Sequence, residues 1–414
     1  MERFRIAVLT ETLPSERLFL QPWRYLGELA SALQREGHEV SVVTGDDVLK
    51  KWNDVPVDRH ATRGDFASAP GVRQIVRSHG YDVGVFRLTA GHFFSLRRRP
   101  RNVPSTGRLV GIFLRPLHRG LDLARRFLDP TLASEAFFDR HHAAMYASRL
   151  LGTWSVAPSR IDDFVFLWEG DRRCAIDAGL PPAACSVLRH PFDPFFRERG
   201  PWDPGLRLFE VLKAVPRRIV FSGPPEPTRG FDDVINLARW LPREPPTEML
   251  VLLRDPKFRE PTITRMPRGP HSVVVVRGIL TREEIRAAYG RSHVAVFPYR
   301  FVRTGLPLVA LEAAAAGLPV VTTRVHPIRE LEGKSGLAFA NPRDPRGLAR
   351  AVDSLSDESR LREIREKNEA WIRTTPDWRD VAKAFSATAR GGPGERSGPR
   401  VLEPTKAPAR DGRP

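Results

Sequence analysis

The stretch Thr304–Thr323, TGLPLVALEAAAAGLPVVTT, constrains the fold most, because it combines a loop, a short helix and a buried strand. Pro307 suits the first turn of a helix, where its missing N–H costs nothing, and Leu308–Ala316 is rich in strong helix formers. Gly317 is a natural residue just past a helix end, and Val320–Thr323 then has the character of a central strand. The stretch therefore predicts one βα unit of a parallel sheet.

One acid, Glu312, interrupts this otherwise apolar helix. A glycine loop that leads into a helix N-terminus is a ready anion site, since free N–H groups and the helix dipole point at the ligand. Glu312 follows Leu308 by one turn on the same side, so it can accept hydrogen bonds from a ligand's hydroxyls. The alternative is an ordinary βα unit with a partly exposed glutamate, and the stretch alone favours neither.

Length and composition allow two domains with real cores, since the chain has 414 residues and 41% of them are hydrophobic. No apolar run approaches the ~18 residues that span a bilayer, and the start of the chain, MERFRIAVLTETLP, has no signal-peptide core. We therefore expect a cytoplasmic protein. Cys174 and Cys185 cannot form a disulfide framework and lack partners for zinc, which predicts buried or incidental thiols.

The net charge of +17, carried mostly by arginine, favours anionic partners such as nucleotides, phosphorylated lipids, membrane surfaces or nucleic acid. Arg97–Arg101 is the densest basic run, and a solvated loop is its simpler interpretation. Arg115–Arg126 mixes leucine with arginine and suits contact with an anionic membrane, with a partly exposed basic helix as the preferred alternative. No recognised nucleic-acid module is visible, so we expect no specific nucleic-acid partner.

Strands and helices alternate along both halves of the chain, which implies parallel sheets with ligands at the carboxyl ends of their strands. The predicted strands are Arg5–Leu9, Val40–Thr44, Tyr81–Arg87, Leu109–Leu114, Ser155–Ser159, Ser186–Arg189, Arg218–Ser222, Met249–Leu253, Val273–Val276, Val294–Pro298 and Val320–Thr323. The main predicted helices are Trp23–Glu36, Phe231–Trp240, Thr281–Tyr289, Leu308–Ala316, Asp344–Leu355 and Glu358–Trp371. Thr281 and Glu284 have the spacing of a capping box.

A linker between two α/β domains is predicted near residue 205, because glycine, proline and charge are dense in Glu198–Leu206. The predicted parts are a first domain over 1–205, a second over 206–375, a helix over 376–390 and a disordered tail over 391–414.

Taken in order, several motifs resemble the retaining GT-B glycosyltransferases, in particular family 4 with its sucrose, glycogen and mannosyl transferases. They are Gly223-Pro-Pro-Glu-Pro-Thr-Arg229-Gly230, Val276-Arg-Gly278-Ile279, Glu283–Tyr289, Thr304–Glu312 followed by GLPVVTT, and Asn341-Pro-Arg-Asp-Pro. The match covers Arg217 to about Phe385 well and Arg5–Thr44 moderately, and it is weak between Gly45 and Gly200.

The resemblance implies two Rossmann-like domains that face each other across a cleft. The first would bind the acceptor and the second the nucleotide sugar, and Thr375–Phe385 would begin the helix that crosses back onto the first domain. It also implies a UDP- or GDP-sugar donor, a retaining reaction and no metal or other cofactor.

Carried over residue by residue, the resemblance places Glu312 on the ribose hydroxyls, Arg229 on the phosphates and the backbone of Ile279 on the base. The implied donor-binding set is Gly223, Arg229, Ile279, Thr304, Gly305, Leu306, Pro307, Leu308 and Glu312.

Two positions depart from the family pattern. Thr304 occupies the first acidic position of the family's E-x7-E motif, near the transferred sugar, and Pro224 stands where an arginine often precedes the family lysine. Only one of two phosphate cations is therefore at its expected place. Three nearby arginines are candidate substitutes: Arg277, Arg300 and Arg303.

The implied chemistry stabilises the diphosphate as it leaves, and a single well-placed donor contributes ~3 kcal/mol to such a step. The candidate catalytic residues are Arg229, Glu312, His92 and His118. Both histidines follow predicted strands and have a loop role as their alternative, and Arg87 falls nearer the family's histidine position by strict register. Arg24 follows the first strand and either contacts an acceptor or packs on the sheet.

The leading hypothesis is a glycosyltransferase of polysaccharide biosynthesis that acts on a glycan, lipid-linked or small-molecule acceptor, in the cytoplasm or peripherally at the inner membrane face. Thr304 and Pro224 keep open a catalytically inactive scaffold that binds nucleotide or glycan. Two further alternatives are association with nucleic acid driven by charge alone and another GT-B enzyme, such as a sugar epimerase.

Overall fold

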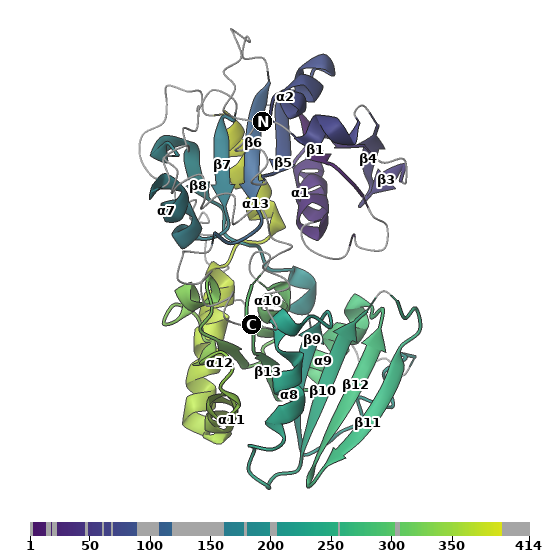
Figure 1. Ribbon diagram of the computed structural model, residues 1–414, viewed down its shortest axis with the longest axis vertical. Helices are drawn as coiled ribbons and strands as arrows, with labels where there is room; N and C mark the ends of the chain where they lie inside the picture. The colour runs from purple at the N-terminus through teal and green to yellow at the C-terminus, as the bar shows by residue number, and fades with distance from the viewer. Residues whose placement is uncertain are drawn as a thin grey trace, which may run out of the picture.

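The computed structural model consists of two α/β domains, which lie one above the other in Figure 1. It describes residues 3–13, 18, 23–45, 49–59, 62–67, 69–88, 107–117, 161–177, 180–198, 205–255, 257–302 and 307–390. The predicted division near residue 205 falls between the two sheets.

The first domain is built on an eight-stranded sheet of order β3-β4-β2-β1-β5-β6-β7-β8, in which only β3 and β4 pair antiparallel. Its strands are β1 (Arg5–Thr10), β2 (Glu39–Thr44), β3 (Lys51–Trp52), β4 (Val55–Asp58), β5 (Val83–Arg87), β6 (Arg108–Phe113), β7 (Asp163–Phe166) and β8 (Cys185–Val187). Its described helices are α1 (Trp23–Arg35), η2 (Arg63–Ala67), α2 (Ala69–Ser78), α7 (Glu169–Asp177), η4 (Pro182–Ala184) and η5 (Pro194–Phe196).

The second domain is built on a seven-stranded sheet of order β11-β12-β10-β9-β13-β14-β15, in which only β11 is antiparallel to its neighbour. Its strands are β9 (Arg217–Gly223), β10 (Thr247–Arg254), β11 (Thr262–Arg268), β12 (His271–Gly278), β13 (Val294–Phe297), β14 (Val320–Thr323) and β15 (Ala338–Ala340). Its described helices are η6 (Pro227–Arg229), α8 (Phe231–Leu237), α9 (Arg282–Gly290), α10 (Leu308–Ala315), η7 (Ile328–Leu331), α11 (Pro345–Asp353), η8 (Ser354–Ser356) and α12 (Glu358–Thr374).

Local sequence signals account for the elements around the predicted ligand edge. Every residue of β9 and β13 is buried, as their apolar runs require for central parallel strands. The capping box predicted at the start of α9 is present, because Thr281 and Glu284 each accept a hydrogen bond from the other's backbone N–H. Helix α10 ends just before Gly317, whose φ of +82° favours glycine.

Helix α13 (Trp378–Arg390) returns to the first domain and packs on α1, as Figure 1 shows. The rings of Tyr25 and Trp378 meet edge to face with centroids 5.1 Å apart. His38 Nε2 and Ser386 Oγ are hydrogen-bonded at 2.7 Å, and Arg108 donates to the carbonyl oxygen of Ala389. The crossing helix that the resemblance implied is therefore part of the first domain's core.

Five strands of the structure were not predicted: β3, β4, β7, β11 and β15. Strand β7 begins at Asp163, whereas the predicted strand Ser155–Ser159 lies outside the described residues. Strand β11 is almost wholly exposed, so its sequence TITRMPR carries no pattern of burial that would reveal it. In the described ranges, no helix combines the length and apolar character that a membrane span needs.

Candidate functional site

The candidate site lies at the carboxyl ends of β9 and β13, where the predicted residues Arg229 and Glu312 come from different loops and helices. Strand β9 ends at Gly223 and leads through η6, which contains Arg229, into α8. The turn requires Gly230, because its φ is +70° and a Cβ there would lie 2.0 Å from the carbonyl oxygen of Pro298.

The guanidinium of Arg229 is held beside the buried phenol of Tyr299. Its Nη1 donates to Tyr299 Oη at 3.3 Å, its carbon lies 5.5 Å from the ring centroid, and its Nε is 3.5 Å from Glu226 Oε2. Burial raises the pKa of Tyr299, so the phenol stays neutral and leaves the positive charge of Arg229 in place. Arg229 is therefore a fixed cation at the edge of the sheet.

Glu312 is only 1% exposed, so the alternative of a partly exposed glutamate is wrong. One carboxylate oxygen, Oε1, accepts a hydrogen bond from Arg24 Nη1 at 2.8 Å. The other, Oε2, is buried and has no hydrogen-bond partner in the structure described. A buried carboxylate oxygen without a partner is costly, which is the usual mark of a group kept for a ligand rather than for stability.

Arg24 connects the two domains through this carboxylate. It projects from α1 of the first domain, bonds Glu312 of α10, and lies 3.3 Å from Asp193, which also pairs with Arg282 of α9. Burial opposes the charge of Arg24, but Glu312 and Asp193 outweigh it and raise the Arg24 pKa. Arg24 thus pairs with carboxylates at the interface between the domains instead of only packing on the sheet, and its contact with an acceptor stays a prediction.

The domains also meet beside β15, at the start of α7. The backbone N–H of Gly170 lies 3.2 Å from both carboxylate oxygens of Glu330, and His326 Nε2 lies 3.1 Å from Asp171 Oδ1. Burial raises the pKa of Glu330. Polar contacts therefore join the two domains here as well as at Arg24.

The backbone of Ile279 already makes two hydrogen bonds within the chain, so its predicted role toward a base depends on the second lone pair of its carbonyl oxygen. Its N–H donates to the carbonyl oxygen of Phe258 at 3.0 Å, and its carbonyl accepts from Arg207 Nη2 at 2.9 Å. No backbone donor is left for a ligand. The side chain is 40% exposed and remains available for apolar contact.

Two of the three candidate substitute cations are paired elsewhere. Arg300 makes two hydrogen bonds to Asp233, at 3.0 and 2.7 Å, and Arg277 lies 3.3 Å from Asp255. Arg303 lies outside the described residues. Sequence analysis missed a further arginine, Arg254, because the predicted strand stopped one residue before it.

The remaining predicted residues divide between described and undescribed parts. Pro307 precedes α10 as its N-cap, Leu308 begins that helix, and Gly223 ends β9. Outside the described residues lie His92, His118, Thr304, Gly305 and Leu306. Arg87 ends β5 at the facing edge of the first sheet, and burial together with the charge of Arg115 lowers its pKa to about 10.

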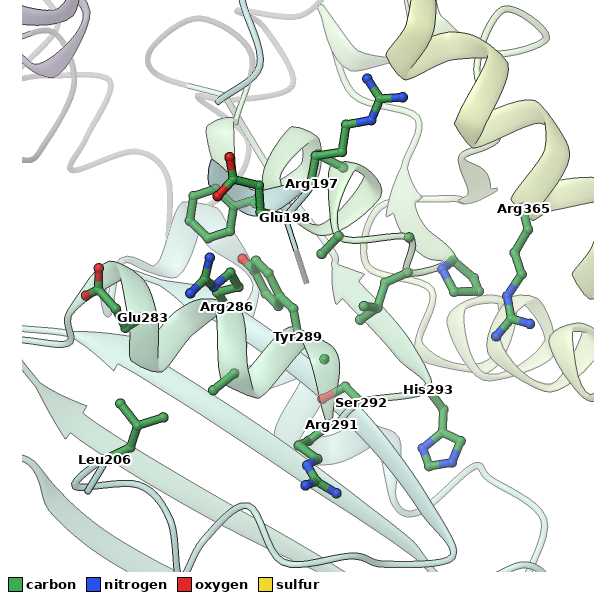
Figure 2. Close-up of a pocket in the computed structure, with 18 residues that line it drawn as sticks. Arg197, Glu198, Leu206, Glu283, Arg286, Tyr289, Arg291, Ser292, His293 and Arg365 are labelled. Carbon is green, nitrogen blue, oxygen red and sulfur yellow. The ribbon is translucent and has the colours of Figure 1, made fainter. Parts of the chain in front are cut away.

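A cavity bounded by described residues lies away from this edge. It has a volume of about 720 Å³ and is lined by α9, the carboxyl end of α10 and residues that precede β13 and β14. Figure 2 shows four arginines around it: Arg197, Arg286, Arg291 and Arg365. His293 and Pro319 place it at the amino ends of the strands, opposite Glu312. Among the described residues, no three His, Cys, Asp or Glu side chains gather as a metal-binding group.

Comparison with known proteins agrees with the predicted family resemblance. Residues 216–358 match the family glycosyl transferases group 1. The chain is 32% identical over 186 residues to a glycogen synthase of Mycobacterium tuberculosis, a match that covers 42% of this chain and 44% of that protein. It is 29% identical over 163 residues to the sulfoquinovosyl transferase SQD2 of Arabidopsis thaliana, covering 36% of this chain and 29% of that protein. The chain thus spans less than half the length of these relatives.

Solved structures share the fold across nearly the whole chain. A sucrose-phosphate synthase from Thermosynechococcus elongatus superposes with a TM-score of 0.63 at 15% identity, covering 94% of this chain and 98% of that one. Anabaena HepE in complex with UDP-glucose gives 0.61 at 16% identity, covering 93% and 99%. The predicted GT-B architecture is therefore confirmed.

Proposed function

We propose that this chain, a GT-B protein whose second domain matches glycosyl transferases group 1, transfers a sugar from a nucleoside-diphosphate sugar to an acceptor. One observation carries the proposal: Glu312 is buried at the domain interface, one turn into α10, with one oxygen unpartnered among the described residues, and both it and Arg229 interact electrostatically with Tyr299. This is the arrangement that a ribose and a diphosphate require together.

In this proposal the second domain binds the donor. The N-terminus of α10 and the guanidinium of Arg229 hold the diphosphate, while Glu312 accepts hydrogen bonds from the ribose hydroxyls. Arg24 occupies Glu312 Oε1 in the structure. The carboxylate therefore either shares its oxygens between Arg24 and the ribose or exchanges one for the other.

The chemistry we propose is attack of an acceptor hydroxyl on the anomeric carbon of the sugar, from the same face that the nucleoside diphosphate leaves. The hydroxyl proton passes to the departing phosphate oxygen. Negative charge grows on the leaving group, and Arg229 together with the α10 amides stabilises it in a partly buried site, where such donors act strongly. Fixed protein donors perform this task without a metal ion, and we include metal independence and retention in the proposal. A UDP-sugar is the first donor to try, since HepE was solved with UDP-glucose.

The acceptor would bind at the facing edge of the first sheet. Arg87 lies there, at the end of β5, and His92 and His118 follow the strands of the same edge in sequence. A glycan, a lipid-linked sugar or a small molecule are the acceptor classes that we propose, in the cytoplasm or with peripheral contact at an anionic inner membrane face.

The test is to incubate the chain with UDP-, GDP- and ADP-sugars and an acceptor panel, and to measure nucleoside diphosphate release together with product. We expect release that depends on an acceptor and that is lost in both Glu312→Ala and Arg229→Ala. Full turnover in both variants would defeat the proposal.

A second candidate function is a nucleotide-binding scaffold without transferase activity, favoured by Thr304 in place of the family's first acid. The same assay separates the two. Nucleoside diphosphate binding without transfer or hydrolysis across the whole panel would support the scaffold, and any sugar transfer would eliminate it.

A further inference from the structure

Arg254 ends the strand next to β9, directly beside the position where the family arginine is missing. In the parallel pairing of β9 and β10, Leu253 lies opposite Gly223. The next residue along each strand is Arg254 on β10 and Pro224 after β9. Arg254 therefore lies next to Pro224, at the carboxyl ends of the two strands.

The charges around Arg254 are those of the candidate donor site. Its guanidinium interacts electrostatically with Glu312, Arg24 and Arg229, as well as with the phenol of Tyr289. Burial disfavours the charge of Arg254 and lowers its pKa, while Glu312 opposes that effect. Arg254 thus adds a positive charge beside Arg24 and Arg229, and a cation held in a water-poor site favours an anionic ligand.

Two other arginines near this edge are paired with carboxylates other than Glu312. Arg300 forms two hydrogen bonds with Asp233, and Arg277 pairs with Asp255 and stacks on the ring of Phe258 at 5.2 Å. Arg254 differs from both because the carboxylate it interacts with is Glu312, the ligand-binding candidate itself.

We propose that Arg254 binds the diphosphate of the donor from the strand end next to the position of the lost family arginine, and so replaces the cation that Pro224 removed. The inference rests on the proposed function. An arginine suits this role because its planar guanidinium offers paired N–H donors to phosphate oxygens and stays charged when partly buried. Its place at the end of a central strand fixes it more firmly than a loop would.

The experiment measures the affinity of UDP, GDP and ADP for the full chain by calorimetry, and then compares the tightest of them with its nucleoside. Arg254→Gln should weaken diphosphate binding by about tenfold to a hundredfold, the loss expected for a hydrogen-bonded charge pair. The nucleoside, which lacks phosphates, should bind both proteins equally. Arg254→Lys should recover part of the loss, since it restores a point charge without the paired donors.

Arg277→Gln is the matched control, since Arg277 lies on the neighbouring strand and is paired with Asp255. Its diphosphate affinity should stay within about twofold of the unmodified chain. Unchanged diphosphate binding in Arg254→Gln would overturn the inference and leave the proposed function standing, as would an equal loss for diphosphate and nucleoside. If the unmodified chain binds none of the nucleotides, the proposed function fails and Arg254 with it. If Arg254→Gln does not fold, Arg254→Lys takes its place. A larger loss of affinity for the diphosphate than for the nucleoside then supports the inference, and equal losses or no loss overturn it.

Discussion

Buried charged side chains at the two ends of the second sheet differ in how fully they are hydrogen-bonded. At the amino end, Arg218 is 1% exposed and its guanidinium donates to Glu248 and to three backbone carbonyl oxygens. At the carboxyl end, Glu312 is equally buried, yet one of its oxygens has no hydrogen-bond partner in the described structure. Thr228, in the loop that contains Arg229, also has a buried hydroxyl oxygen that lacks such a partner there.

The difference shows which buried charges stabilise the fold and which are held for a ligand. The hydrogen bonds of Arg218 hold the segment that precedes β9 and the C-terminal end of α9 at the amino end of the sheet. A buried carboxylate oxygen without a partner, such as Glu312 Oε2, costs stability, and a ligand that bonds to it would offset that cost. The predictions below test this division, from the largest expected effect to the smallest.

Arg218→Met should lower the free energy of unfolding by ~3–5 kcal/mol, because it leaves Glu248 buried without its main cation. Urea unfolding followed by fluorescence measures the loss. Replacing both residues, as Arg218→Met with Glu248→Leu, should recover much of it. A loss under ~1 kcal/mol in the single variant would show that the amino end is not the stabilising end.

Protonation of His190 should destabilise the folded chain in acid. Burial, with a smaller effect of Arg24, lowers the pKa of His190 from 6.5 to about 4, so the neutral form is the stable one. Its contribution is complete above pH 6.5 and is lost as the pH falls toward 4, by up to about 3 kcal/mol. Unfolding measured at steps of pH should show this slope, and His190→Asn should flatten it. An equal slope in both proteins would assign the acid sensitivity to other groups.

Glu312→Gln should weaken nucleoside diphosphate binding by ~1.5–3 kcal/mol while it changes unfolding by less than ~1 kcal/mol. The binding loss follows from the charged acceptor that the ribose would lose, and stability changes little because the glutamine oxygen can still accept from Arg24 Nη1 and Arg24 keeps its pair with Asp193. Calorimetry and urea unfolding on the same preparation separate the two effects. A large loss of stability without loss of binding would make Glu312 a structural residue like Arg218.

Arg277→Gln should be nearly silent, with a change in unfolding within ~0.5 kcal/mol, because the Arg277 side chain is 42% exposed and Asp255 also accepts a hydrogen bond from the backbone N–H of Lys257. Thermal melting in low and high salt is a sufficient check. A cost above ~1 kcal/mol would mean that exposed pairs beside the site also contribute to stability.

Local signals in the sequence predicted several elements around the candidate site of the second domain closely, although β11 and β15 were missed. Strand β14 has the predicted bounds, the capping box of α9 is where the Thr281–Glu284 spacing placed it, and α10 ends before Gly317. These features depend on residues a few positions apart, and the hydrophobic pattern records such relations directly.

The site itself could be predicted only in part, because its geometry depends on distant partners. The burial of Glu312 is set by Arg24, 288 residues earlier in the chain, and no periodicity reports such a contact. The hydrogen bonds of the Ile279 backbone to Phe258 and Arg207 likewise join distant parts of the chain. Arg254 escaped notice because only strand register places it beside Pro224.

The most direct measurement is a crystal structure of the chain with the nucleoside diphosphate that binds it most tightly. We predict the ribose hydroxyls on Glu312, with the diphosphate between Arg229, Arg254 and the first turn of α10. A nucleotide bound instead in the arginine-lined cavity of Figure 2, with Glu312 still covered by Arg24, would contradict the account.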